Sequence, residues 1–247
     1  MPKFFVETNQ IKDKKIKIEG KDINHIKNVL RLKSNDKIEI CNSQTYENYN
    51  CKIETISNES IICSIIDKIK KDTEATIKTT IFQGIPKFDK MELIIQKSVE
   101  LGVYDITPVS MKRCVVKINE KDQTKKIQRW NKISEVAAKQ SGRNIIPKVN
   151  NIIEIKNIAE IIKNYDIFLI AYEEEKENYI KQEIKKIKKQ ENLKIGILIG
   201  PEGGLEKQDV ENLKRNGAKI ISLGSRILRT ETVALNILSI LNYELEI

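Results

Sequence analysis

The spacing of apolar residues changes near residue 75, and this change limits the folds open to the chain. Before it, short isoleucine-rich runs alternate with polar residues, as in "KKIKIEG" and "DKIEICN". After residue 75, similar apolar runs alternate with longer segments in which apolar residues recur every three or four positions. A period of two is typical of strands, and a period near 3.6 is typical of helices. The sequence therefore predicts two domains, residues 1–72 and residues 73–247.

Residues 1–72 read mostly as strands, and Asn, Ser, Gly and Asp separate them. One amphipathic helix, "DINHIKNVLRL", interrupts the series. Several short strands with one helix in about seventy residues indicate a small β-barrel. The strands are expected at residues 14–20, 36–42, 49–56 and 60–69.

From residue 76 onward, predicted strands and helices alternate along the chain. This order is typical of an α/β fold with a parallel sheet covered on both faces. In such sheets, ligands bind beyond the carboxyl ends of the strands. The strands are expected at residues 76–85, 104–110, 165–173, 193–200 and 218–224. The helices are expected at residues 87–102, 129–142, 178–190, 206–217 and 232–245.

The segment "IGPEGGL" begins where one of these strands ends, so it is a candidate binding loop. It matches neither of the common glycine-rich nucleotide motifs, and Glu202 would repel a phosphate. A cationic or neutral ligand fits better. Gly203 and Gly204 allow a positive φ and a close approach of ligand to backbone. A tight turn with Glu202 in solvent is the alternative, and these residues alone leave it open.

The segment "LGSRILRTETV" also begins at a strand end. It places Arg226, Arg229 and Glu231 around two apolar residues, and Thr230 or Thr232 could cap the final helix. The alternative is a plain loop with a surface Arg–Glu pair, which contributes little stability. The local residues do not decide between a binding loop and this alternative.

Charge and composition narrow the class of partner. The net charge is +9, and residues 84–150 alone carry 14 Lys and Arg against 7 Asp and Glu. A basic region of this kind indicates a polyanion such as nucleic acid, although a lysine-rich surface without a partner is the alternative. Four cysteines and one histidine lack the spacing of a zinc site, so no metal is expected. No long apolar stretch predicts a membrane span or a secretory signal, which favours a cytoplasmic protein.

"GPEGG" followed by "SLGSRILRTET" resembles the C-terminal signature of the ribosomal RNA small subunit methyltransferase E family. Members methylate N3 of uracil-1498 in 16S rRNA and belong to the SPOUT superfamily. "HIKNVLRLKSND", "KMELIIQKSVELGV", "PVSMKRCVV" and "RWNKISEVAAKQSGRNIIP" match the family in the same order along nearly the whole chain. Two departures are Asn35, where glycine is usual, and Val233, where alanine is usual.

The resemblance implies a fold and a cofactor. Residues 1–72 would form an RNA-binding barrel of the PUA type, and residues 73–247 a SPOUT domain with a deep C-terminal trefoil knot. S-adenosylmethionine would lie in the knot, and a homodimer would complete the site. The cofactor-binding residues implied are Ala171, Ile199, Gly200, Pro201, Glu202, Gly203, Gly204, Leu223, Gly224, Ile227, Leu228, Thr230 and Thr232.

The implied reaction also assigns candidate catalytic residues. Uridine N3 carries a proton at neutral pH, so methylation requires its removal or stabilisation of the developing anion. Arg229 is the candidate cation for that anion. Glu231 is either a proton acceptor or a residue that orients Arg229, and the identity of the general base stays open. The candidate RNA contacts are His25, Arg31, Lys87, Lys90, Lys112, Arg113 and Arg143.

The partner would be 16S rRNA, either free or in the assembled small ribosomal subunit. Two other functions fit the same residues. One is a SPOUT methyltransferase that acts on another RNA such as tRNA. The other is a non-catalytic RNA-binding assembly protein, which the intact "GPEGG" and "LRTET" segments argue against.

Overall fold

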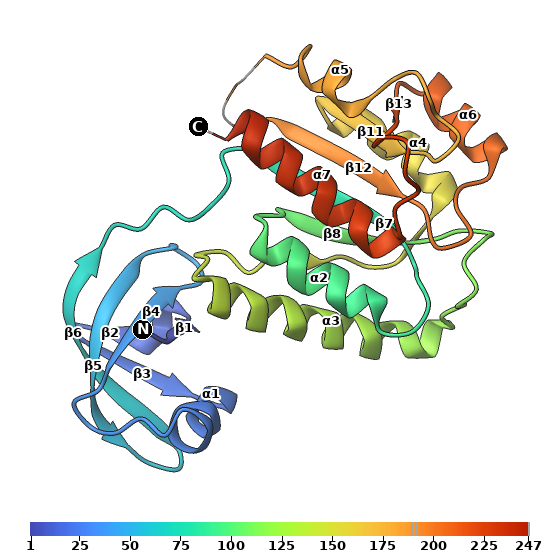
Figure 1. Ribbon diagram of the computed structural model, residues 1–247. Coiled ribbons are helices and arrows are strands. Elements are labelled where there is room, and N and C mark those ends of the chain that lie inside the picture. Colours follow the sequence, from blue (N-terminus) through green and yellow to red (C-terminus); the bar gives the residue numbers. More distant parts are fainter. Residues whose placement is uncertain (189, 191, 247) are drawn as a thin grey trace. The chain divides into compact units, whose positions relative to one another are not determined.

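A computed structural model describes residues 1–188, 190 and 192–246, which form two compact units (Figure 1). The first unit contains Met1–Glu74 and Ala138–Ile146, and the second contains Ala75–Ala137 and Pro147–Ile247. The segment 138–146 therefore packs with the first unit, whereas the sequence analysis placed it in the second domain. None of the described helices is both long enough and apolar enough to span a bilayer.

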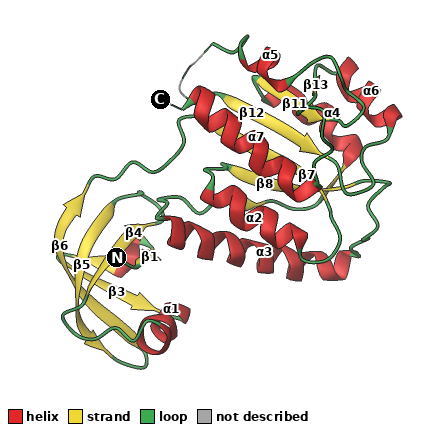
Figure 2. Cartoon of the chain, viewed as in Figure 1, coloured by secondary structure: helices red, strands yellow, loops and turns green. Residues whose placement is uncertain are grey.

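The first unit is a curled sheet in the order β1-β4-β5-β6-β3-β2 (Figure 2). Its core forms because alternate side chains point inward: in β3, Ile16 and Ile18 are buried between exposed Lys and Glu residues. The predicted small barrel is confirmed as a curled half-barrel, which is open because no pairing joins β1 to β2 among the described residues. The strands are β1 (Lys3–Val6), β2 (Ile11–Lys12), β3 (Lys15–Glu19), β4 (Lys37–Asn42), β5 (Asn48–Ile56) and β6 (Ser60–Ile69).

Buried polar side chains attach the segment 138–146 to the first unit. Lys3 is almost fully buried, and its Nζ lies 2.7 Å from Asn144 Oδ1 and 3.0 Å from Glu39 Oε1. Arg143 Nε donates to Glu74 Oε2 at 3.1 Å, and the Asn144 backbone N–H donates to Glu74 Oε1 at 2.7 Å. A buried charge left without partners costs several kcal/mol, so these contacts specify where the segment lies. The predicted helix after β3 is present as α1 (Lys21–Asn24) and the π-helical turn η2 (His25–Val29).

The second unit contains the predicted parallel sheet, in the order β10-β8-β7-β12-β11-β13 with β9 paired to β8. All of its strand pairings are parallel. The central strand β12 is buried on both faces, as the continuous apolar run "IGILI" predicts. The strands are β7 (Lys78–Gly84), β8 (Asp105–Ser110), β9 (Lys148–Val149), β10 (Ile153–Glu154), β11 (Ile167–Ala171), β12 (Lys194–Ile199) and β13 (Lys219–Ile221).

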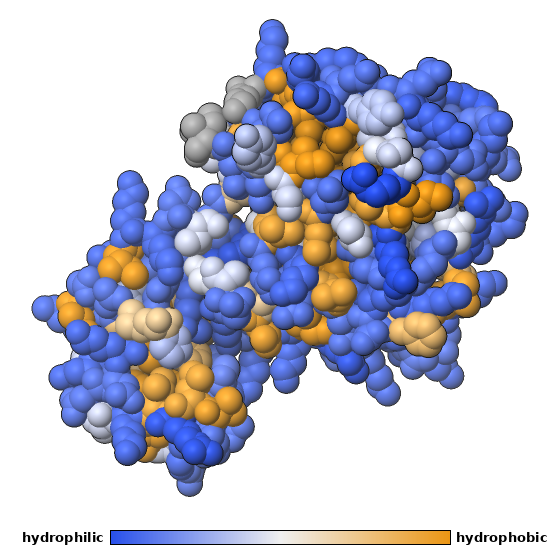
Figure 3. Space-filling model, in the orientation of Figure 1, coloured by the Kyte–Doolittle hydropathy of each residue, from blue (hydrophilic) through white to orange (hydrophobic). Residues whose placement is uncertain are grey.

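Helices cover both faces of this sheet (Figure 1). One face carries α2 (Lys90–Glu100) and α7 (Thr230–Leu245), and the opposite face carries α4 (Ile158–Ile161) and α6 (Lys207–Arg215). The remaining helices are α3 (Glu120–Ser141) and α5 (Ile180–Ile184). Figure 3 shows a mostly hydrophilic face on which apolar side chains gather over α2 and α7.

The boundaries of most predicted helices are close to those observed. Gly102 ends α2 with a φ of 83°, which confirms its predicted position just beyond the helix. The helix predicted over 178–190 is limited to α5, and residue 189 lies outside the described residues. The trefoil knot that the resemblance implies stays a prediction.

A glycine in the middle of β12 makes room for an aromatic cluster. A Cβ at Gly196 would lie 2.4 Å from Phe168 Cδ2, so any larger residue would displace that ring. Phe168 packs on Phe82 and Tyr165 with ring centroids 5.3 Å and 5.7 Å apart. Such pairs add about 0.5–1.5 kcal/mol beyond area burial. The cluster fixes β7, β11 and β12 beside one another, and the ends of β11 and β12 carry part of the candidate site.

Candidate active site

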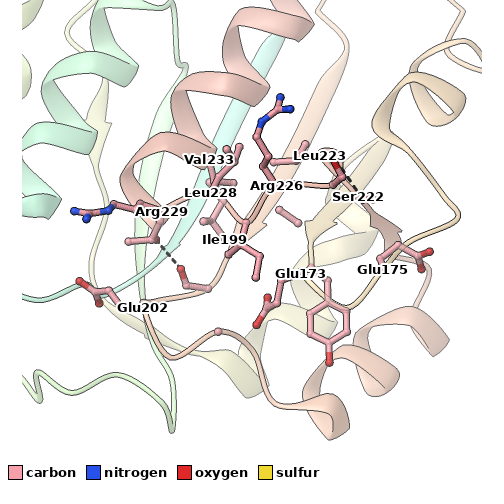
Figure 4. A pocket seen from close by; sticks show the side chains of 18 of the residues that line it. Glu173, Glu175, Ile199, Glu202, Ser222, Leu223, Arg226, Leu228, Arg229 and Val233 are labelled. Carbon is pink, nitrogen blue, oxygen red and sulfur yellow. Dashed lines mark hydrogen bonds between the residues drawn. The ribbon is translucent and has the colours of Figure 1, made fainter.

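A cavity of about 750 Å³ lies at the carboxyl ends of β11, β12 and β13 (Figure 4). Three loops line it: the segment 172–179 after β11, the glycine loop 200–206 after β12, and the arginine loop 222–229 after β13. The first turn of α7 and Lys90 complete the wall. Neighbouring parallel strands end at the same edge of a sheet, so three loops distant in sequence meet at one place.

Most of the predicted cofactor-binding residues line this cavity. Gly203 and Thr232 are the two that do not, and the predicted catalytic residues divide in the same way, with Arg229 in the wall and Glu231 outside it. The predicted cofactor residues in the wall are Ala171, Ile199, Gly200, Pro201, Glu202, Gly204, Leu223, Gly224, Ile227, Leu228 and Thr230.

Sequence analysis missed the segment after β11. Five of its residues line the cavity: Tyr172, Glu173, Glu175, Lys176 and Tyr179. Figure 4 shows Glu173 and Glu175 among the side chains of the cavity wall. The signal that could have found them is the rule applied to the other two loops, since "YEEEKENY" directly follows a buried strand. With Glu202, the wall holds three carboxylates, and the cations Lys90, Lys176, Arg226 and Arg229 line it as well.

Gly204 gives the glycine loop its shape. Its φ is 71°, and a Cβ at this position would lie 2.1 Å from Glu173 Oε1. Left-handed backbone costs other residues about 1–2 kcal/mol, and here a side chain would also collide with a carboxylate. Gly203 does not have a positive φ, so that expectation is corrected for this residue. It approaches Arg113 instead, where a Cβ would lie 3.0 Å from the backbone oxygen.

Thr230 connects the glycine loop to α7. Its Oγ1 donates to the carbonyl oxygen of Gly200 at 2.7 Å and accepts a hydrogen bond from Gln83 Nε2 at 2.8 Å. The predicted capping role is therefore wrong: the N-cap of α7 is Arg229, with no side-chain cap. The hydroxyl is buried and already used between β7 and the glycine loop.

Glu202 is held within the protein rather than left in solvent. Its carboxylate accepts the backbone N–H of Lys87 at 3.1 Å and pairs with Lys90 Nζ at 3.0 Å. Burial acts to raise the pKa of Glu202, but the hydrogen bonds from Lys90 and from backbone N–H groups lower it below its ordinary value. Glu202 is therefore an anion at neutral pH, with a side chain that is 25% exposed.

Arg229 and Glu231 do not pair with each other. Glu231 Oε2 lies 3.4 Å from Lys90 Nζ, and no ion pair joins Glu231 to Arg229 within the described residues. Arg229 is exposed at the N-terminus of α7. Of the two roles left open for Glu231, orientation of Arg229 thus has no contact to support it here.

The predicted RNA-binding residues lie in different settings. His25 and Arg31 are exposed on the first unit. Lys87 is half-buried before α2, and Arg113 is exposed with its Nη1 donating to the Gly203 oxygen at 3.1 Å. Arg143 is only 4% exposed and is paired with Glu74, so we do not carry it forward as an RNA contact.

Comparisons with known proteins define the class. Residues 73–242 match the family model described as an RNA methyltransferase domain, and residues 18–66 match the model of the RNA methyltransferase PUA domain. With the parallel sheet and the strand-end cavity, these matches define a PUA-containing RNA methyltransferase of the SPOUT superfamily. The chain belongs to the ribosomal RNA small subunit methyltransferase E family.

The relatives cover the whole chain. It is 35% identical to ribosomal RNA small subunit methyltransferase E of Bacillus subtilis, over 100% of this chain and 98% of that protein. It is 36% identical to the protein of the same name from Mesomycoplasma hyopneumoniae, over 97% of this chain and 98% of that one.

Two solved structures of relatives hold a ligand. Ribosomal RNA small subunit methyltransferase E from Neisseria gonorrhoeae, bound to S-adenosyl methionine, superposes with a TM-score of 0.88 at 28% identity, covering 99% of this chain and 98% of that chain. A Legionella pneumophila methyltransferase in complex with bound SAM gives a TM-score of 0.86 at 27% identity, covering 98% and 96%.

Proposed function

We propose that this protein uses S-adenosylmethionine to methylate N3 of a specific uridine in 16S rRNA, at uracil-1498. The observation that carries the proposal is the single cavity that both signature segments, "GPEGG" and "LGSRILRT", line at the strand ends. Family membership over the full length and the cofactor bound by two solved relatives support it.

The cavity wall suits S-adenosylmethionine in charge and shape. Glu173, Glu175 and Glu202 line the cavity and are the proposed counter-charges for the sulfonium and ammonium groups of the cofactor. Buried Ile199 and half-buried Leu223 supply apolar surface for an adenine ring. The bare backbone at Gly204 lets a ligand approach closely. When bound, the cofactor supplies the methyl group.

The chain's own residues would position the base and manage its charge. The bond between the sulfonium and the methyl carbon breaks, the bond from that carbon to N3 forms, and the N3 proton leaves to a base. Arg229 lines the cavity and has no ion-pair partner among the described residues, so its guanidinium is available to the uracil oxygens. N3 lies on the Watson–Crick edge, so the target base must be unpaired when it enters.

RNA and a second copy of the chain complete the proposal. Exposed His25 and Arg31 on the first unit, with Lys87 and Arg113 on the second, are the proposed RNA contacts. The proposed homodimer uses α7, whose Tyr243 is 86% exposed and whose Val233, Leu235 and Ile240 are half-buried. In the shared orientation of Figures 1 and 3, apolar side chains gather over α7.

The test is methylation with labelled S-adenosylmethionine of free 16S rRNA, assembled small subunits and tRNA in parallel, each prepared without the modification. Mapping of the labelled nucleotide should find one uridine, carrying the methyl group on N3. Label found in tRNA alone would show that the substrate is another RNA. Cofactor binding without methyl transfer to any RNA would favour a non-catalytic assembly protein.

A further inference from the structure

Lys90 occupies a central position that the activity described so far does not explain. It is the first residue of α2, and it lines the cavity. Its Nζ lies 3.0 Å from Glu202 Oε1 and 3.4 Å from Glu231 Oε2. Glu202 belongs to the glycine loop and Glu231 to the first turn of α7, so one ammonium group contacts both signature segments.

The local helix does not account for a lysine at this position. A cation at a helix N-terminus is opposed by the helix dipole, which favours acidic residues there. The neighbouring carboxylates explain why a cation is needed at this position. Glu231 is 15% exposed, and its Oε2 is shielded from solvent with no regular hydrogen bond among the described residues. A shielded carboxylate is costly without a counter-charge, and Lys90 supplies one.

We propose that Lys90 is a positioning residue of the methyltransferase site, whose ammonium pairs with both Glu202 and Glu231 and so holds the glycine loop against α7. This inference rests on the proposed function. The chemical requirement is a positive charge at the meeting point of two anionic side chains, beside a cavity that takes a cationic cofactor. Lys90 thereby acts through the two glutamates rather than on the base.

The charged surroundings determine the sign of the pH effect. The hydrogen bond to Glu202 raises the pKa of Lys90, so the ammonium persists through the neutral range. Burial acts to raise the pKa of Glu202, and removing Lys90 takes away a hydrogen bond and a charge that lower it, so this pKa should be higher in the variant than in the wild type. Among the described residues, the Lys87 backbone N–H also donates to Glu202, and Arg229 lines the same cavity. Burial and the charge of Glu202 both act to raise the thiol pKa of Cys114. As pH falls, Glu202 should therefore become protonated at a higher pH in the variant than in the wild type.

The experiment compares Lys90→Met, Lys90→Arg and the control Lys97→Met. Lys97 is on the same helix and pairs with Glu100 outside the cavity, so its substitution removes an equal charge elsewhere. Single-turnover methylation and calorimetric S-adenosylmethionine affinity are measured from about pH 5 to about pH 9, which spans the titration of shifted carboxyls.

We expect Lys90→Met to lower the rate at least about tenfold, because small displacements of a positioned group are costly. Its cofactor affinity should also begin to fall at a higher pH than in the wild type. Lys90→Arg should restore the wild-type pH profile, and Lys97→Met should leave both quantities unchanged.

Two outcomes would overturn the inference. One is a normal rate and pH profile in Lys90→Met. The other is an equal loss of rate and affinity at every pH in both Lys90 variants, which would show that the substitutions only disturb packing. If wild type and Lys97→Met fail to methylate, the proposed function fails instead, and the pH dependence of cofactor affinity alone then decides the role of Lys90.

Discussion

Thr230 Oγ1 and the carbonyl oxygen of Gly200 are joined by a 2.7 Å hydrogen bond across 30 positions of sequence. The same hydroxyl accepts from Gln83 Nε2, so a single buried atom connects β7, the glycine loop and α7. The two signature segments are therefore mechanically coupled, and a change at Thr230 should affect both stability and ligand affinity.

Replacing Thr230 with Val keeps the shape of the side chain and removes its donor and acceptor. The half-buried Gly200 carbonyl loses its bond from Thr230, and the buried Gln83 amide keeps only its bond to the Gly84 oxygen. The expected cost is about 1–3 kcal/mol in the free energy of unfolding. S-adenosylmethionine affinity should fall as well, because the glycine loop loses its attachment. Urea unfolding and calorimetry measure these effects. Thr232→Val, at an exposed position on the same helix, is the control, and equal effects in the two variants would contradict the prediction.

Gly204→Ala should weaken cofactor binding while the protein still folds. The added Cβ would lie 2.1 Å from Glu173 Oε1 on a backbone with a φ of 71°. Gly217→Ala is the matched control, because its φ is 104° and its Cβ would meet only Ile162 Cγ2 at 3.9 Å. Both variants should lose about 1–2 kcal/mol of stability from left-handed backbone. Only Gly204→Ala should reduce affinity in calorimetry, and an equal affinity in both would remove Gly204 from the site.

Arg229→Ala tests the proposed stabilisation of the uracil anion. Removing such a donor lowers the rate by about a hundredfold or more, while S-adenosylmethionine affinity should stay within a few fold. Arg229→Lys should recover only part of the rate, because a point charge cannot bridge two acceptor atoms as a planar guanidinium does. Single-turnover rates on the same RNA provide the measurement, with Arg215→Ala on α6 as the control. Near-normal rates for Arg229→Ala would contradict the proposed catalytic role of Arg229.

The proposed homodimer predicts a solution mass of twice 28.5 kDa by light scattering at micromolar concentration. Tyr243→Asp places a charge on the exposed face of α7, where Tyr243 is 86% exposed. A charge buried in an interface without a partner is strongly unfavourable, so this variant should run as a monomer. Tyr46→Asp, at an exposed aromatic of the first unit, should leave the mass unchanged. A fully active monomer would refute a site shared between two copies.

Periodicity predicted the parallel sheet because each of its central strands is a local apolar run, and Gly102 marked the end of α2. It could not predict that β1 pairs in parallel with β4, since that pairing depends on residues far apart in sequence. How far the sheet curls could not be predicted for a related reason: β2 has only two residues, and within the described part of the chain it pairs only with β3. Strand closure is a property of the assembled sheet and has no signature in a short window.

The candidate site was predictable where a glycine-rich or arginine-rich segment followed a buried strand. The acidic segment after β11 followed the same rule and was overlooked. The contacts of Thr230 and Lys90 could not be read from local sequence, because each depends on a partner from a distant element. A threonine before an apolar run predicts a helix cap, and only the fold shows that its hydroxyl is already bonded to Gly200.

Residues 138–146 pack with the first unit although they come much later in the sequence, and this affects how the unit folds during synthesis. Glu74 and buried Lys3 find partners in Arg143 and Asn144, which the ribosome adds much later. Domains generally fold in order as they emerge from the ribosome, but this one must wait for its second piece. A fragment that stops at residue 74 lacks that piece, so producing the first unit alone requires joining residues 138–146 to it.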